Sequence, residues 1–182
     1  MTSKKRNSLY WSLFSNENWK MYIAATNDGL CFVGSQNQSF EELAKWANHY
    51  LPGYDLIRDD EKLNPFVNEL VHYFQGNLNQ FTIPIFYRGT PFQEAVWKAL
   101  CDIPYGQTRS YSDIAQQIQK PTAVRAIGRA IGANPILITV PCHRVIGKNG
   151  SLTGYRGGME MKTQLLELER GFTNSGKELQ HV

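Results

Sequence analysis

The chain has 182 residues, 42% of them hydrophobic, which is enough for an ordinary buried core in one or two small domains. No apolar run approaches the roughly 20 residues that span a bilayer, so a membrane protein is not expected. The net charge of +3 is unevenly divided, because residues 1–87 sum to −2 and residues 88–182 to +5, which suits a polyanionic partner for the second half.

Residues 1–87 predict an N-terminal α/β scaffold domain that begins with strands. Apolar or alternating runs at Leu9–Phe14, Met21–Ala25 and Leu30–Val33 indicate three strands. Asn27–Gly29 has the composition of a hairpin turn between the last two.

Two helices are predicted after these strands. Ser39-Phe40-Glu41-Glu42 has the pattern of a capping box, so a helix begins there, and Pro52-Gly53 ends it. Apolar residues between Phe66 and Phe74 indicate a second helix. We expect this domain to have no chemistry of its own, with His49 and His72 at the surface or in the core.

The second domain, residues 88–182, follows an extended linker at Phe81–Arg88. It opens at Thr90–Gln93, a capping box with proline at the first helical position. We expect Cys101, at the end of this helix, to lie in the core, and Ile103–Gly106 to form a turn.

Two short helices then predict a helix-turn-helix. Ser110–Asp113 opens the first, Lys120-Pro121 breaks the chain, and Thr122–Gly132 forms the second. The small residues of the second helix keep one face slim, which favours close, sequence-tolerant contact with DNA, with Arg125 as the long cationic side chain. The same small residues would also serve plain helix packing, and many two-helix corners bind nothing.

Pro141-Cys142-His143-Arg144-Val145 is the segment with the most chemical content. Free cysteine titrates near ~8.5, and polarising or cationic neighbours lower that pKa, so Cys142 is a candidate thiolate nucleophile. The alternative is a small buried cysteine without reactivity.

The surroundings of Cys142 favour the reactive alternative. Asn134-Pro135 precedes it, Gly154-Tyr155-Arg156-Gly157-Gly158 follows it, and the arginine-bearing helix lies upstream. In this order and spacing, the chain from about Thr90 to Gly171 resembles the O6-alkylguanine-DNA alkyltransferase family, the methylated-DNA–protein-cysteine methyltransferases. Before Thr90 the resemblance is mostly one of layout.

The resemblance implies a catalytic set. Cys142 would accept the alkyl group, His143 would withdraw its proton through a water, Glu169 would orient His143, and Asn134 would hold the turn before the active-site strand. For Glu169 the sequence adds support, because it lies on the helix face of Leu165 and Leu166 and should point inward towards a partner. That partner is His143, or alternatively Arg144 or Lys162.

The resemblance also implies a DNA-binding and base-binding set. Tyr111 would lie beside the flipped nucleotide and donate a hydrogen bond towards the base oxygen, and Arg125 would replace the extruded base in the duplex. Val145 and the loop Gly154–Gly158 would form the pocket, with Tyr155 over the ring. The remaining members of this set are Thr122, Ala123, Ala126, Gly128, Leu152 and Arg156.

Two departures from relatives bear on the site. Arg156 occupies a loop position where some relatives have a small residue, which puts pocket width in question. The zinc ligands that some relatives carry are not evident, and the three cysteines Cys31, Cys101 and Cys142 form no CxxC pair. We therefore expect no metal, no cofactor, no disulfide framework and a cytoplasmic location. The basic segment Met1–Asn7 is followed by no apolar stretch typical of a signal peptide.

The fold expected is α/β of the α+β kind, with the N-terminal sheet-and-helix domain and a C-terminal helix-turn-helix, winged-helix-like alkyltransferase domain. The function expected is single-use DNA repair by a monomer, in which an alkyl group moves from O6-alkylguanine, or O4-alkylthymine, in double-stranded DNA to Cys142. The alternative is an alkyltransferase-like protein that binds the lesion without transfer. Regulatory methyltransferases carry an additional cysteine cluster, and a Cys-His hydrolase would need an oxyanion hole and would have no use for Arg125.

Overall fold

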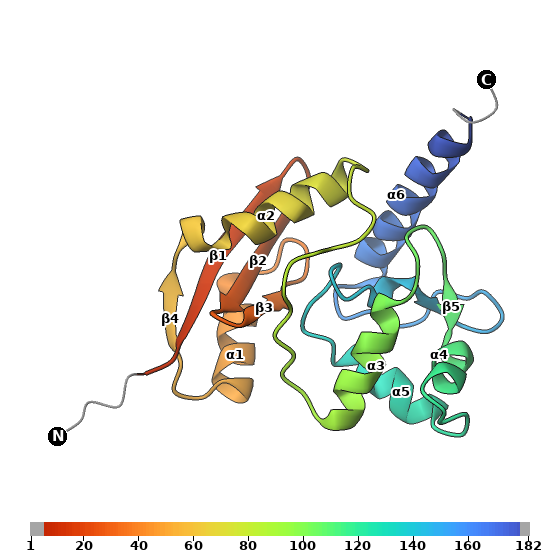
Figure 1. The fold of residues 1–182 in the computed structure, drawn as a ribbon, viewed down its shortest axis with the longest axis horizontal. Coiled ribbons are helices and arrows are strands. Elements are labelled where there is room, and N and C mark those ends of the chain that lie inside the picture. The colour runs from red at the N-terminus through yellow and green to blue at the C-terminus, as the bar shows by residue number, and fades with distance from the viewer. Residues whose placement is uncertain (1–5, 179–182) are drawn as a thin grey trace.

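A computed structural model describes residues 6–178. Its N-terminal sheet has four strands in the order β3-β2-β1-β4 (Figure 1). They are β1 (Ser8–Asn16), β2 (Trp19–Thr26), β3 (Gly29–Val33) and β4 (Asp55–Arg58). The first three pair antiparallel and confirm the predicted strands, whereas β4 pairs parallel with β1. Strand β4 was not predicted because its four residues are all exposed and show no alternation.

A helix covers each face of this sheet. The first is α1 (Phe40–Tyr50) and the second is α2 (Asp60–Phe74). Neighbouring strand residues point to opposite faces, so Ala24 and Phe32 pack in the cluster that contains α1, whereas Ile23 and Val33 pack in the larger cluster that contains α2. Strand β3 is buried along its whole length as a result.

The capping box predicted at Ser39 is wrong in its bonding, although the helix begins where expected. Ser39 is the N-cap residue, but its side chain makes no capping hydrogen bond. The carboxylate of Glu42, which would complete the box, instead accepts hydrogen bonds from Ser35 and Arg156. A long-range partner has replaced the local one.

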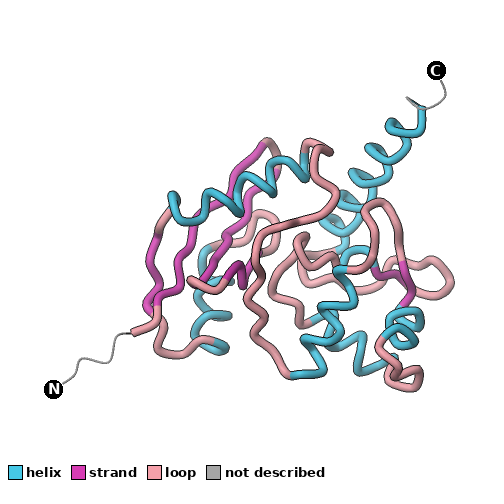
Figure 2. Tube along the Cα trace, viewed as in Figure 1, coloured by secondary structure: helices cyan, strands magenta, loops and turns pink. Residues whose placement is uncertain are grey.

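The linker packs along the edge of the sheet. The backbone N–H of Leu30 donates to Pro84 at 2.9 Å, and the N–H of Phe86 donates to Leu30 at 2.8 Å. A Cβ on Gly29 would lie 2.6 Å from the Pro84 oxygen, and the φ of Gly29 is +147°, so only glycine allows this approach. Figure 2 shows the linker as a long loop between the two halves of the molecule.

The C-terminal region is mainly helical. Its helices are α3 (Pro91–Cys101), α4 (Tyr111–Gln117), α5 (Val124–Gly132) and α6 (Met159–Glu178), and its two short parallel strands are β5 (Arg109–Ser110) and β6 (Val145–Ile146). The capping boxes predicted at Thr90 and Ser110 are both present. The indole of Trp97 donates to the Ala130 oxygen at 2.8 Å and fixes α3 against α5. One hydrophobic core runs through both regions.

Three local expectations in this region were wrong. The second helix of the helix-turn-helix begins at Val124, so Thr122 and Ala123 precede it. Cys142 lies on a single 3-10 turn, η1 (Cys142–Arg144), rather than on a strand. Cys101 is exposed rather than part of the core. Within residues 6–178, every helix is too short or too polar to cross a membrane.

Candidate active site

Cys142 is buried at the start of η1, with 3% of its surface exposed. The side-chain amide of Asn134 lies 3.2 Å from the Cys142 sulfur and also donates to the Val140 oxygen at 3.0 Å. The amide oxygen of Asn134 accepts from the Ile136 N–H at 2.9 Å. Asn134 therefore fixes the backbone at Ile136 and at Val140, before Cys142, and polarises the Cys142 thiol.

The resting Cys142 is a thiol rather than the thiolate that the sequence favoured. Burial raises the pKa of Cys142, and the hydrogen bond from Asn134 only partly opposes this effect. A group that removes the proton is therefore needed before the sulfur can act as a nucleophile.

His143 and Glu169 form a buried pair beside Cys142. The Nε2 atom of His143 lies 2.7 Å from Oε1 of Glu169, and the two residues are 0% and 1% exposed. Burial lowers the pKa of His143, so the ring is neutral at pH 7. Burial alone would raise the pKa of Glu169, but the hydrogen bonds from His143 and Arg144 and the charge of Arg144 hold it well below its usual range.

The protonation of this pair fixes the tautomer of His143. An ionised carboxylate only accepts hydrogen bonds, so the single N–H of neutral His143 lies on Nε2 and points to Glu169. Nδ1 is then an acceptor, and it has no hydrogen-bond partner within residues 6–178. Nδ1 is the ring nitrogen that can take up a proton.

Glu169 accepts three further donors, of which the sequence predicted only Arg144. Arg144 donates from Nε at 3.0 Å and from Nη2 at 2.9 Å, the Tyr73 hydroxyl donates at 2.7 Å, and the Gly106 N–H donates at 3.2 Å. Of the three partners predicted for Glu169, His143 and Arg144 are both present, whereas Lys162 donates to the Val145 and Thr153 oxygens instead. The only sequence signal for Tyr73 was a polar hydroxyl on the apolar stripe of α2.

A loop between β6 and α6 faces the helix-turn-helix. The ammonium of Lys162, which is 0% exposed, donates to the Val145 oxygen at 2.6 Å and to the Thr153 oxygen at 2.8 Å. The hydroxyls of Thr153 and Tyr111 lie 2.9 Å apart. Lys162, which the sequence did not single out as a site residue, anchors this loop, and Tyr111 joins the loop to α4.

The predicted pocket residues differ in where the structure places them. Val145 is fully buried, whereas Leu152 is 38% exposed. The Tyr155 hydroxyl is buried without a partner among the described residues, and its pKa is raised well above the usual value by burial and by the nearby Cys142. Tyr155 and Val145 thus lie close to the reactive turn, and Leu152 lies at the surface.

The Arg156 side chain is held by hydrogen bonds within the protein. Its Nε donates to the Asn134 oxygen at 3.0 Å, and its Nη2 donates to the oxygens of Val33 at 2.8 Å and Pro135 at 3.2 Å. Its Nη1 pairs with Glu42 of α1. The guanidinium therefore joins the active-site loop to the N-terminal sheet.

The helix-turn-helix presents an open surface. Arg125 is exposed, and within residues 6–178 it makes no ion pair or side-chain hydrogen bond. Thr122 is exposed as well, whereas Ala123, Ala126 and Gly128 are partly buried. A Cβ on Gly128 would lie 3.9 Å from the Tyr111 ring, so α5 packs closely on α4 at this point.

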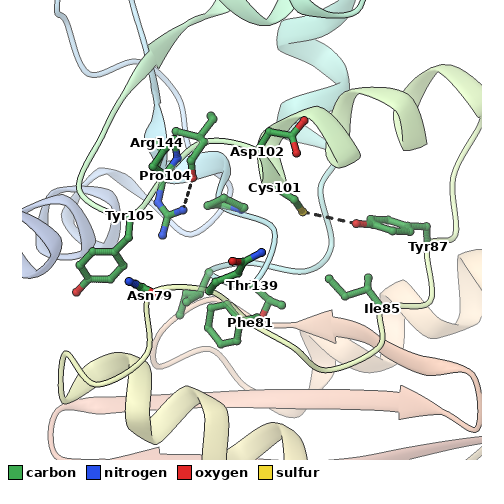
Figure 3. A pocket seen from close by; sticks show the side chains of 14 residues that line it. Asn79, Phe81, Ile85, Tyr87, Cys101, Asp102, Pro104, Tyr105, Thr139 and Arg144 are labelled. Atoms are coloured by element: carbon green, nitrogen blue, oxygen red, sulfur yellow. Dashed lines mark hydrogen bonds between the residues drawn. The ribbon is translucent and has the colours of Figure 1, made fainter.

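A separate cavity of about 660 Å³ lies behind the reactive turn, between the linker, the end of α3 and the segment that precedes Cys142 (Figure 3). Tyr105, Thr139 and Arg144 line it. The hydroxyls of Tyr105 and Thr139 have no hydrogen-bond partner in the described part of the chain. Cys101 also lies in this cavity, with its sulfur 3.6 Å from the Tyr87 hydroxyl.

No group of three or more histidine, cysteine, aspartate or glutamate residues within residues 6–178 could hold a metal ion. The expectation of a metal-free protein remains to be tested by a metal assay, and one tightly held zinc per chain would contradict it.

Two family models match almost the whole chain. The one described as "6-O-methylguanine DNA methyltransferase, ribonuclease-like domain" matches residues 9–87. The one described as "6-O-methylguanine DNA methyltransferase, DNA binding domain" matches residues 91–171.

Individual relatives agree with this match. A Bacillus subtilis (strain 168) protein named methylated-DNA–protein-cysteine methyltransferase, inducible, is 64% identical over 163 residues, which cover 90% of this chain and 91% of the relative. A Methanosarcina mazei protein named methylated-DNA–protein-cysteine methyltransferase is 49% identical over 161 residues, covering 88% and 97%. The crystal structure of Mycobacterium tuberculosis OGT in complex with DNA superposes with a TM-score of 0.77 at 40% identity, covering 90% of this chain and 94% of that chain.

Proposed function

Because the chain belongs to the 6-O-methylguanine DNA methyltransferase family, we propose that it repairs alkylated DNA by moving the alkyl group from O6 of guanine to its own Cys142. The residue assignment rests on the buried hydrogen bonds that join Asn134 to Cys142 and His143 to Glu169. The protonated thiol of Cys142 is polarised by Asn134 and is followed in the chain by neutral His143. The Nε2 atom of His143 is hydrogen-bonded to ionised Glu169.

His143 acts as the general base. Its Nδ1 takes the Cys142 proton through one water molecule, and the imidazolium that forms is stabilised by the carboxylate of Glu169. Arg144 in turn keeps Glu169 ionised. The proton therefore leaves the sulfur without an unpaired charge arising in the buried site.

The transfer is a direct displacement at carbon. The Cys142 thiolate forms a bond to the alkyl carbon, the bond between that carbon and O6 breaks, and its electron pair remains on the guanine. The guanine then takes up one proton, which balances the proton lost by the thiol. The Tyr111 hydroxyl donates a hydrogen bond towards the leaving oxygen as negative charge develops there.

The helix-turn-helix delivers the base. A buried sulfur cannot reach an atom inside the duplex, so the alkylated nucleotide must turn out of the stack. The exposed Arg125 on α5 occupies the vacated space, while the slim face around Ala126 and Gly128 allows α5 to approach the groove closely. The protein acts on double-stranded DNA as a monomer.

Each chain acts once. The product is a thioether at Cys142, which is a poor leaving group, and the other cysteines lie elsewhere: Cys31 is in the N-terminal core and Cys101 in the separate cavity. Burial also raises the pKa of Cys31 to about 12, so it stays protonated. Three cysteines without a disulfide suit the reducing cytoplasm, which is the proposed location.

The alternative of lesion binding without transfer is not favoured. Alkyltransferase-like proteins replace the reactive cysteine, whereas Cys142 is present here within hydrogen-bond distance of Asn134. The relatives that match over most of the chain are named as methyltransferases.

The DNA product tests the proposal. A duplex with one O6-methylguanine is mixed with an equal amount of protein and digested to nucleosides, which are separated by chromatography. We expect the methylated nucleoside to be replaced by deoxyguanosine, one per protein molecule, and Cys142→Ser to leave the lesion unchanged. An abasic site, or a lesion bound but unchanged by the wild type, would contradict the proposal.

A further inference from the structure

Tyr73 connects the N-terminal region to the reactive site. It lies on α2, it is 0% exposed, and its hydroxyl donates to Oε1 of Glu169 at 2.7 Å. Oε1 is the same oxygen that accepts His143 at 2.7 Å. The two residues are 96 positions apart in the sequence, so the bond exists only because α2 packs against the C-terminal region.

The neighbouring Tyr105 provides a natural comparison. The two rings pack edge to face with centroids 5.8 Å apart, and both adjoin the same carboxylate region (Figure 3 shows Tyr105 and Arg144). The Tyr105 hydroxyl has no hydrogen-bond partner within residues 6–178, whereas the Tyr73 hydroxyl is directed at Glu169. Burial of an aromatic ring explains Tyr105, but it does not explain where the Tyr73 hydroxyl points.

We infer that Tyr73 is a positioning residue through which the N-terminal region fixes the Glu169 carboxylate and thereby sets how strongly His143 binds a proton. The inference rests on the proposed function, in which His143 takes the proton of Cys142. It assigns to α2 a part in the chemistry of a site that otherwise lies wholly in the C-terminal region.

The negative charge of the Glu169 carboxylate is shared among its hydrogen-bond donors. Glu169 accepts from His143, Arg144, Tyr73 and the Gly106 N–H, and each donor draws part of the negative charge. Without the Tyr73 donor, Oε1 interacts more strongly with the proton on His143, so the pKa of His143 rises. The carboxylate also loses a constraint on its orientation, so the His143 ring is held less firmly for proton uptake.

The other charged or titratable groups around the pair are unchanged by a substitution at Tyr73. Arg144 on η1 and Lys162 on α6 both lower the pKa of His143, and Cys142 precedes it on η1. Tyr105, in the turn after α3, interacts with Glu169 through its charge and not through a hydrogen bond. A shift measured in a Tyr73 variant therefore reports on the Tyr73 hydroxyl.

The test compares Tyr73→Phe with Tyr105→Phe, because each removes one buried hydroxyl from adjacent rings. Single-turnover alkyl transfer from an O6-methylguanine duplex is measured between pH 5 and 9, and the pKa of His143 is followed by NMR of its ring nitrogens. We expect Tyr73→Phe to slow transfer about three- to tenfold at neutral pH and to raise the pKa of His143 by about half to one unit. The acid limb of the rate profile should move by the same amount. Tyr105→Phe should change neither.

A double-mutant cycle separates positioning from general loosening of the fold. In a Glu169→Gln background the carboxylate charge is gone, so adding Tyr73→Phe should produce little further slowing. An equal slowing in both backgrounds, or equal effects of the two Phe variants, would overturn the inference. If the wild type transfers no alkyl group, the proposed function fails, but the NMR shift of His143 still decides whether Tyr73 acts on it.

Discussion

The buried network around Glu169 and the exposed face of α5 use their polar atoms in opposite ways. Both oxygens of Glu169 accept hydrogen bonds, from donors on α2, the turn after α3 and η1. Arg125 on α5, in contrast, is exposed and makes no polar contact within the described residues. The hydrogen bonds to Glu169 are in place before any substrate arrives, whereas the Arg125 side chain is left to solvent.

This difference separates chemistry from recognition in the molecule. A network that is already fixed needs no rearrangement when a proton moves from the Cys142 sulfur to His143. This is the condition for electrostatic catalysis. An exposed arginine on a slim helix costs nothing in water, and in the proposed function it gains its interaction energy at the DNA. Substitutions in the two regions should therefore change different measured quantities.

The largest expected effect is in the network. His143→Ala removes the base for a thiol whose pKa burial has raised, so alkyl transfer should slow by about 10²–10⁴-fold. Affinity for the duplex, measured by fluorescence anisotropy, should stay within about twofold because His143 is fully buried. His72→Ala, which alters an exposed histidine on α2, is the control. Normal transfer by His143→Ala would remove the general-base role.

The hydrogen bonds to Glu169 should also make the free energy of unfolding depend on pH. Glu169→Gln leaves the buried Arg144 without its counter-charge, so the free energy of unfolding at pH 7 should fall by about 3 kcal/mol. The pKa of Glu169 is depressed in the folded protein, so the wild type loses this stabilisation as pH falls below about 4.3, the value for an unfolded glutamate.

The difference between wild type and Glu169→Gln should therefore narrow below that pH, as measured by urea unfolding. Glu167→Gln, an exposed position on the same helix, should follow the wild type at every pH. A constant difference between pH 7 and 3 would show that the carboxylate charge contributes no stability.

On the recognition side, Arg125→Ala should slow repair in duplex DNA by about 10- to 100-fold, because the cost of holding the base outside the stack is no longer offset. Reaction with a free-base substrate such as O6-benzylguanine should be nearly unchanged. Arg129→Ala, an exposed arginine on the same helix, should have a smaller effect on the duplex reaction. Equal losses of transfer rate on duplex and on free base would show that Arg125 acts in the chemical step and not in DNA recognition.

The smallest expected effect is at the contact between Arg156 and Glu42. Both side chains are 23% exposed, so Glu42→Gln should lower the free energy of unfolding by about 1 kcal/mol or less and slow transfer only slightly. Glu41→Gln, which breaks an exposed pair with Lys45, should be neutral. A large change in the transfer rate with free base would show that the Arg156 contact controls the pocket after all.

Local patterns predicted much of this arrangement. The capping boxes at Thr90 and Ser110 involve residues three apart and form as expected, and the spacing of Glu169 from Leu165 predicted a buried carboxylate. The box at Ser39 did not form, because the Glu42 carboxylate accepts from Ser35 and from Arg156, which is more than 100 positions away.

The missed residues share that long-range character. Tyr73 and the Gly106 N–H reach Glu169 through packing between elements far apart in sequence, which no local period reveals. The predicted direction of the pKa shift of Cys142 was wrong for a related reason. The neighbouring histidine and arginine suggested a lowered pKa, but burial, which depends on the whole fold, raises it.

The most direct test of the central claim is the intact mass of the protein after reaction with an equimolar O6-methylguanine duplex, followed by peptide mapping. Cys142→Ser serves as the control. We predict that the wild type gains the mass of one methyl group in place of hydrogen, on Cys142 alone, and gains no more with excess duplex. A wild type that binds the duplex and keeps its original mass would contradict it.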